Sequence, residues 1–104
     1  MGRAARRKPA RLAEKLLIIR NGLGLSQNGI IRRMGFVDEI TQAGISMFER
    51  GIRVPSLPVL LEYARAANLY LEVLVDDSLD LPSTIPSQVK HEGVRRKLKA
   101  RKKT

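Results

Sequence analysis

Apolar residues return every three or four positions in four stretches of the chain, which is the period of an α-helix with one buried face. The first stretch follows Pro9, the second and third cover residues 27–34 and 42–50, and the fourth follows Ser56. Their inward positions are Leu12, Leu16, Ile19 and Leu23; Ile30, Ile31 and Met34; Ile45 and Phe48; and Leu57, Leu60, Leu61, Ala64 and Ala67. The pattern therefore predicts four helices.

Capping residues mark where these helices begin and end. Ser26, Thr41 and Ser56 stand just before the last three stretches, and serine and threonine are favoured N-caps. Gly35 and Gly51 follow the second and third stretches, where glycine commonly ends a helix. The second and third helices are consequently predicted to be short and consecutive.

The pattern changes after Asn68. Leu69, Leu71, Val73 and Val75 alternate with other residues, and alternation of β-branched and aliphatic residues is typical of a strand. The sequence predicts a strand over residues 69–76. A lone strand leaves backbone groups unpaired, so pairing with the same strand of a second copy in a homodimer is the expected solution. The alternative is a fifth helix, because short apolar runs are ambiguous.

The fold class predicted from these elements is all-α: a four-helix bundle with a C-terminal β-strand that pairs across a dimer.

The distribution of charge distinguishes the predicted domain from the two ends of the chain. Residues 1–11 carry five basic groups and no acid, residues 12–81 carry seven basic and nine acidic groups, and residues 82–104 carry eight basic groups and one acid. We expect a disordered basic arm over 1–9, a folded domain over 10–77 and a flexible basic tail over 78–104, and basic tails favour polyanions such as nucleic acid.

The predicted helix 42–50 carries an unusual outer face. On a helical wheel, the side opposite Ile45 and Phe48 holds side chains that are short, hydrogen-bonding or weakly apolar, with one cation: Gln42, Ala43, Ser46, Met47 and Arg50. Such side chains suit the DNA major groove, where glutamine pairs with adenine and small apolar groups contact thymine methyls. A face buried against another subunit would favour similar residues, and the wheel alone does not separate the two.

The arrangement of two short capped helices, braced on either side, is the helix-turn-helix plan. Three motifs carry a resemblance: G-L-S-Q at 24–27, I-S-x-x-E-x-G at 45–51 and R-V-P-S-L at 53–57. Over about residues 12–75 the chain resembles the Xre family, with its Cro and lambda-repressor type of helix-turn-helix domain. The segment from Gly35 to Thr41 is longer than the family's turn by about four residues.

The resemblance implies roles for individual residues. It implies base reading by Gln42, Ala43, Ser46 and Met47. It implies phosphate contacts from Gln27, Arg50 and Arg53, and a partly buried ion pair between Arg20 and Glu49 that braces the recognition helix. The predicted strand Leu69–Asp76 resembles that of HipB-like antitoxins, in which a terminal strand joins two subunits.

These observations predict a cytoplasmic DNA-binding transcriptional regulator, a repressor that binds a palindromic site as a homodimer. The alternative is an antitoxin that binds a toxin protein and represses its own operon. An enzyme is not expected: the chain has no cysteine, and its one histidine, His91, lies in the basic tail. The sequence accordingly predicts no metal and no cofactor, and no apolar run is long enough to suggest a membrane span.

Overall fold

The computed structural model describes residues 8–86; residues 1–7 of the predicted arm and 87–104 of the predicted tail lie outside the described residues. Helices are the only regular elements in the described part: α1 (Leu12–Gly22), α2 (Gln27–Met34), α3 (Gln42–Glu49), α4 (Leu57–Ala67) and α5 (Leu71–Val75). The first four coincide with the four predicted helices. The all-α helix-turn-helix bundle is confirmed.

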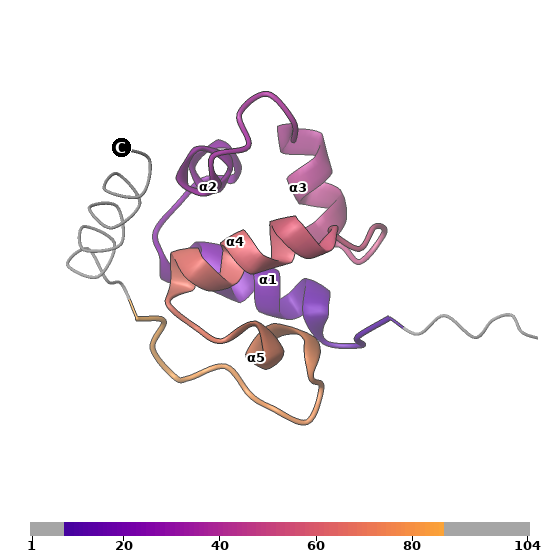
Figure 1. Cartoon of the computed structure of the whole chain (residues 1–104), viewed down its shortest axis with the longest axis vertical. Helices are drawn as coiled ribbons and strands as arrows, with labels where there is room; N and C mark the ends of the chain where they lie inside the picture. Colours follow the sequence, from indigo (N-terminus) through magenta and orange to yellow (C-terminus); the bar gives the residue numbers. More distant parts are fainter. Residues whose placement is uncertain (1–7, 87–104) are drawn as a thin grey trace, which may run out of the picture.

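The helices are arranged around α1 and α4, which cross the middle of the molecule. Figure 1 shows α2 and α3 at one end and α5 at the other. The core between them is fully buried at six large apolar or aromatic positions, namely Leu16, Ile19, Ile30, Ile45, Tyr63 and Leu74. Every helix contributes to this list, so a single core fixes α3 relative to the rest of the domain.

Local capping chemistry sets the ends of α2 and α3. The Ser26 hydroxyl accepts the Gly29 N–H at 2.9 Å, and the Thr41 hydroxyl accepts the Gly44 N–H at 3.1 Å. Gly35 ends α2 with φ of 83°, a left-handed conformation that costs glycine little. Ser56 occupies the N-cap position of α4, but its side chain makes no capping hydrogen bond. The predicted caps at Ser26 and Thr41 are confirmed.

The predicted strand over residues 69–76 is wrong, and with it the assignment of Leu69, Leu71, Val73 and Val75 to a dimer strand. Residues 71–75 form α5, which contacts α1 and α4. Leu74 is fully buried, while Leu69, Leu71, Val73 and Val75 pack against the core from partly buried positions. One helical turn satisfies backbone groups within the chain, so no second copy is required to pair them.

A buried lysine explains how so short a helix is held. Lys15 of α1 is 1% exposed, and its ammonium group donates hydrogen bonds to three carbonyls at the end of α5 and just after it. The acceptors are the carbonyls of Val73 at 2.7 Å, Asp76 at 3.0 Å and Leu79 at 2.8 Å. A cation at a helix C-terminus satisfies carbonyls that have no partner within the helix.

Acidic residues after α5 hold the start of α1 in return. The Asp77 carboxylate accepts the backbone N–H groups of Ala10 at 2.8 Å and Arg11 at 3.1 Å. The Arg11 guanidinium pairs with Asp80 at 2.8 Å. The sequence contains no local cap for α1, and a residue 66 positions away supplies it. These acidic residues look solvated in the sequence because their partners are distant.

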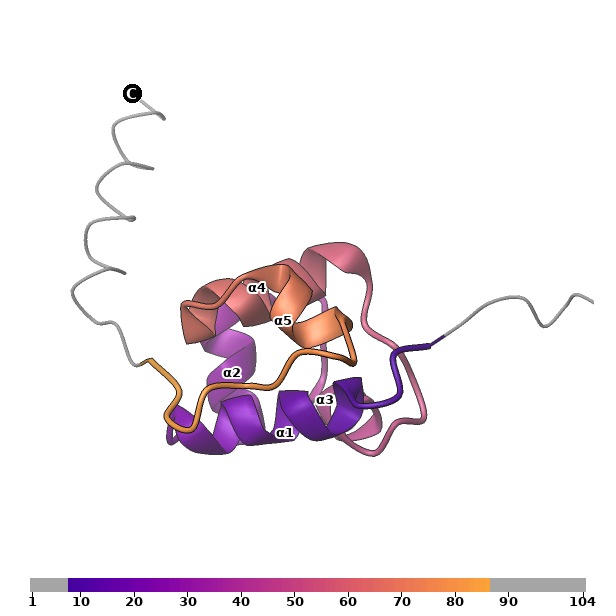
Figure 2. The same ribbon diagram turned by 90° about the horizontal axis from the view of Figure 1, so that it is seen from below.

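The chain then runs along α1, as Figure 2 shows. Ile85 is 7% exposed and belongs to the core. A Cβ atom at Gly22 would lie 2.5 Å from the Ile85 side chain, so this contact requires glycine. The prediction of a flexible tail from residue 78 is therefore wrong for the packed stretch that ends at Ile85.

We expect substitution Asp77→Asn to reduce the slope with which the free energy of unfolding falls at acidic pH. The N–H groups of Ala10 and Arg11 hold the pKa of Asp77 below its ordinary value of 3.8. A lowered pKa means that the carboxylate stabilises the fold above the unfolded-state pKa, and that this contribution is lost as pH falls through the folded-state pKa. Urea unfolding at a series of pH values below about 5 measures the slope.

The control for this experiment is Asp38→Asn, which removes an exposed carboxylate from the turn before α3. The slope of stability against pH should change more for Asp77→Asn than for Asp38→Asn. Equal slopes in the two variants would mean that Asp77 does not stabilise the start of α1.

Candidate DNA interface

The face of α3 that the helical wheel places opposite the core is wholly or partly exposed to solvent. Gln42, Ala43 and Arg50 are exposed, whereas Ser46 and Met47 are half-buried. Ile45 and Phe48 on the opposite side are buried, at 0% and 7% exposed. Ala43 and Ser46 carry small side chains, so they add little steric bulk to this face.

An ion pair joins α1 to the end of α3. Arg20 Nε donates to Glu49 Oε2 at 2.6 Å, and a terminal guanidinium nitrogen donates to Glu49 Oε1 at 3.0 Å. Arg20 also donates to the Leu25 carbonyl at 3.0 Å, in the loop before α2. The Glu49 side chain is 6% exposed and the Arg20 side chain 15%. Such two-point geometry fixes the angle between the helices as well as their distance.

The electrostatics of this pair extend into the core. The hydrogen bond to Glu49 raises the pKa of Arg20, against the opposing effect of burial. Burial raises the pKa of Tyr63, and the Glu49 charge adds to the shift. The Tyr63 hydroxyl has no hydrogen-bond partner among the described residues. Both groups therefore keep their ordinary protonation states at neutral pH, with arginine charged and tyrosine neutral.

A chain of side-chain amide hydrogen bonds connects the Arg20–Glu49 pair to the exposed face of α3. Gln27 Nε2 donates to Glu49 Oε1 at 3.2 Å, and Gln42 Nε2 donates to Gln27 Oε1 at 3.2 Å. Gln27 opens α2 and Gln42 opens α3, so the first residues of the two helices are joined side chain to side chain. The sequence assigned separate roles to these glutamines and gave no sign that they touch, because they are 15 positions apart.

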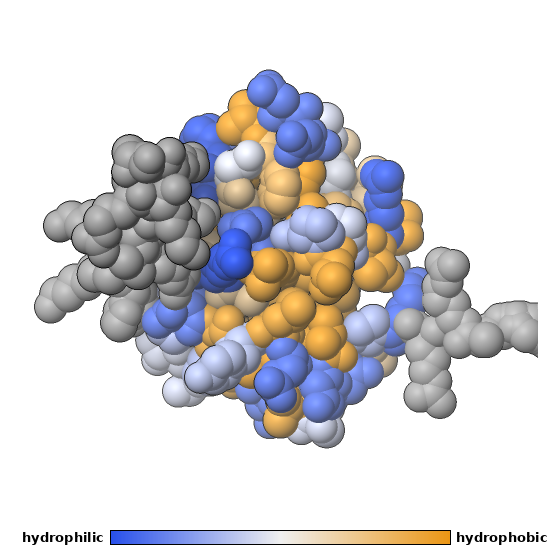
Figure 3. Space-filling model, in the orientation of Figure 1, coloured by the Kyte–Doolittle hydropathy of each residue, from blue (hydrophilic) through white to orange (hydrophobic). Residues whose placement is uncertain are grey.

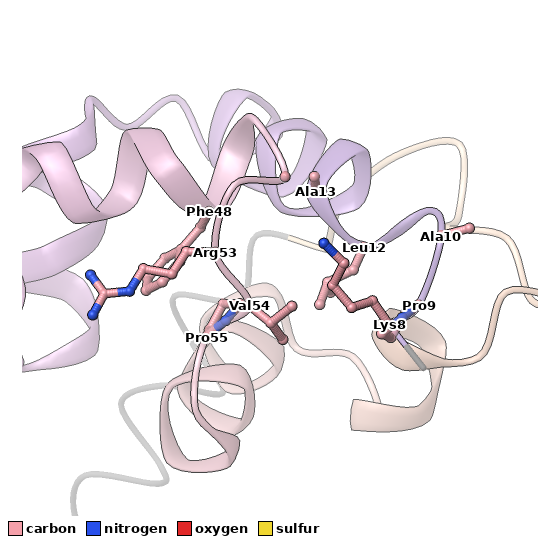
Figure 4. Close-up of a pocket in the computed structure, with 10 residues that line it drawn as sticks. Lys8, Pro9, Ala10, Leu12, Ala13, Phe48, Arg53, Val54 and Pro55 are labelled. Atoms are coloured by element: carbon pink, nitrogen blue, oxygen red, sulfur yellow. The ribbon is translucent and has the colours of Figure 1, made fainter. Parts of the chain in front are cut away.

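The two arginines after Glu49 differ in how they are held. Arg50 Nε donates to the Ser46 hydroxyl at 3.2 Å, one turn earlier on the exposed face of α3. Arg53 lies in the loop between α3 and α4. In Figure 4, the loop and the start of α1 enclose a pocket with apolar walls that include Leu12, Phe48 and Val54, and the Arg53 guanidinium points away from them. Both cations are exposed and can reach a charged partner.

Comparison with known families decides what this arrangement is. A family model described as Helix-turn-helix, HTH_3, matches residues 16–74. The chain belongs to this family of Xre/Cro-type helix-turn-helix proteins. The match begins within α1 and ends within α5, so it includes the whole of α2 and α3. The chain is therefore a DNA-binding transcription regulator. No curated protein and no solved structure matches it.

Within this helix-turn-helix domain, the long connection between α2 and α3 forms a compact turn. The N–H groups of Glu39 and Ile40 both donate to the Phe36 carbonyl at 3.0 Å. Phe36 and Ile40 pack against the core, whereas Val37 at the tip is 62% exposed. The extra residues thus bulge outward, and α3 keeps its contacts with α1 and α2. Asp38 and Glu39 are exposed on the bulge.

Among the described residues, no group of three or more histidine, cysteine, aspartate or glutamate side chains is placed to hold a metal ion. No helix within residues 8–86 is both long and apolar enough to cross a membrane.

Proposed function

We propose that this regulator is a repressor that binds a palindromic DNA site as a homodimer, with α3 in the major groove of each half-site. One observation carries the proposal. The exposed face of α3 begins at Gln42, and hydrogen bonds through Gln27 tie that side chain to the Arg20–Glu49 pair. A side chain held in place before binding loses less conformational entropy when it pairs with a base.

We propose the following roles along the interface. Gln42 pairs with a base edge, and Ala43, Ser46 and Met47 contact neighbouring bases. Gln27, Arg50 and Arg53 contact phosphates and set the register of the domain on the duplex. We propose that residues 10–77 hold the whole of this DNA-binding surface, and that the protein acts in the cytoplasm.

The antitoxin alternative depended on a C-terminal strand resembling that of HipB-like proteins and on the long tail, of which residues 87–104 lie outside the described residues. Residues 71–75 are helical, so the described part of the chain offers no specific observation in favour of a toxin partner. Repression by occupancy of a site needs only specific DNA binding. It is the simpler function for the surface that the domain presents.

Selection of bound duplexes from a random pool tests the proposal, and Gln42→Ala tests its central contact. We expect the wild-type protein to enrich a palindrome with half-sites about one helical turn apart or a multiple of it. Gln42→Ala should relax base preference at one position in each half-site, at about 1–3 kcal/mol per lost contact. Titration against duplexes that differ at that base pair measures the effect.

The control is Arg53→Ala, because this exposed cation lies in the loop after α3 and has the proposed role of a phosphate contact. A phosphate contact carries no sequence information, so Arg53→Ala should weaken binding to all duplexes about equally. If Gln42→Ala also weakened all duplexes equally, α3 would not read bases through Gln42. Enrichment of no sequence at all would overturn specific recognition.

A further inference from the structure

The outer face of α4 carries apolar side chains that the fold leaves uncovered. The sequence pattern placed Leu57 and Leu61 on the inward face, but they are 65% and 36% exposed. They lie one helical turn apart and therefore share one side of the helix. In Figure 3, apolar surface gathers around α4 on the face turned toward the viewer. Contiguous exposed apolar surface is a feature of interaction sites, so this side of α4 is a candidate contact surface.

The next turn of the same helix carries both signs of charge. Glu62 and Arg65 are three residues apart, and the Arg65 guanidinium lies 2.8 Å from the Glu62 carboxylate. Both side chains are partly exposed, at 27% and 46% respectively. Across a two-fold axis, residue i contacts residue j and residue j contacts residue i. An acid and a base beside one apolar stripe are therefore complementary to the same surface of a second copy.

We propose that the outer face of α4, formed by Leu57, Leu61, Glu62 and Arg65, is the surface through which two copies of this chain form the homodimer. The contact is an antiparallel pair of α4 helices. This proposal supplies the interface that the predicted strand does not provide, and it extends the proposed palindromic recognition.

The placement of α4 in the domain supports this partner. In Figure 1, α4 runs across the view, with α3 toward one end and α5 toward the other. A two-fold axis drawn from top to bottom in front of α4 turns the second α4 antiparallel to the first. The same rotation leaves α3 of both copies at the same end of the dimer. To bind the two half-sites of a palindrome on one face of the duplex, a dimer must present both recognition helices at the same end.

The charges select a register for the pair. Setting Glu62 opposite the partner's Arg65 places Arg65 opposite the partner's Glu62, and both pairs form at once. In this register Leu57 reaches the region where the partner's chain passes from α4 into α5. Tyr70 stands there and is 81% exposed. The interface then covers the two most exposed large hydrophobic side chains in the described part of the chain, Tyr70 and Leu57.

Sedimentation equilibrium of the full chain without DNA tests the proposal. We expect the wild type to have twice the mass of the 11.6 kDa chain. Leu57→Glu should weaken dimerisation by about tenfold or more, because it places a charge in an apolar contact. Val37→Glu, at a similarly exposed site on the turn before α3, should leave the dimer unchanged. A wild type that stays monomeric at about 100 μM, or equal effects of the two variants, would overturn the interface.

Charge exchange supplies a second test, with the stability of each variant measured alongside its dimerisation because Glu62 and Arg65 also pair within one chain. Glu62→Arg and Arg65→Glu should each weaken the dimer, and the double variant should restore it, because reversed pairs are complementary again. Failure of the double variant to recover would refute the register. Since no DNA is present, a stable dimer that selects no duplex would contradict the proposed function alone. A monomer that still binds single half-sites would contradict the interface and the homodimer, but not base reading by α3.

Discussion

Substitution Glu49→Ala should lower the free energy of unfolding by about 3–5 kcal/mol, the largest effect we expect from a single side chain of the interface. The Glu49 carboxylate accepts two hydrogen bonds from Arg20 and one from Gln27. Its removal leaves the Arg20 guanidinium, 15% exposed, without its counter-charge. Desolvation of an unpaired cation then opposes folding, and urea denaturation monitored by circular dichroism measures the loss.

Glu14→Ala is the matched control, since it makes the same truncation at an exposed helical site and should change stability by about 0.5 kcal/mol or less. The double variant Arg20→Met with Glu49→Leu should recover much of the loss, because it removes both charges and keeps apolar volume. A cost below about 1 kcal/mol for Glu49→Ala would show that the pair behaves as an exposed surface salt bridge.

Substitution Glu49→Ala should also weaken DNA binding by more than its loss of folding stability explains. With the carboxylate gone, Gln27 loses its acceptor and Gln42 loses the fixed partner that holds its amide. Binding measured at a temperature where the variant remains folded separates the two effects. Affinity equal to wild type under those conditions would mean that the glutamine chain does not prepare α3 for DNA.

Lys15→Met should destabilise the domain by about 2–4 kcal/mol, and it should do so mainly at α5. The methionine fills most of the volume of the lysine stem, so a cavity contributes little. The loss comes from the three carbonyls of Val73, Asp76 and Leu79, which then lose their donor in a partly buried place. Hydrogen exchange of the α5 amides should rise more than that of α2, because local opening at α5 becomes easier.

Ile18→Met is the control for this prediction, because it introduces the same side chain on the exposed side of α1. It should change stability by about 0.5 kcal/mol or less. Uniform exchange across all helices in Lys15→Met would contradict a local clamp and indicate a general loss of core packing. DNA binding at low temperature should persist, since α2 and α3 lie at the other end of the molecule (Figure 1).

Much of the fold could be predicted because its signals are local. The hydroxyls of Ser26 and Thr41 accept hydrogen bonds from N–H groups three residues away, so both partners lie within one short stretch of sequence. The outward face of α3 follows from helical period alone. The family motifs around Gln27 and Glu49 lie within these same elements, and they lead to the helix-turn-helix assignment that the family model shows.

The residues that the sequence misassigned depend on partners far along the chain. Residues 71–75 alternate as a strand would, but Lys15, 58 positions before Val73, offers a donor that suits a helix C-terminus. Leu57 fits the inward stripe of α4, yet the neighbouring elements leave it exposed. In both cases the local pattern permits two outcomes, and packing against α1 or its absence selects one.

By itself, the sequence determined the four main helices, the caps of α2 and α3, the polar face of α3 and the family to which the chain belongs. Only the tertiary structure decided that the final apolar run is helical, that Asp77 caps α1, and that Gln27 links Gln42 to Glu49. The physical reason is the distance along the chain over which each interaction acts. Periodicity and capping act within one or two turns, whereas ion pairs, distant caps and side-chain relays exist only after folding brings separate helices together.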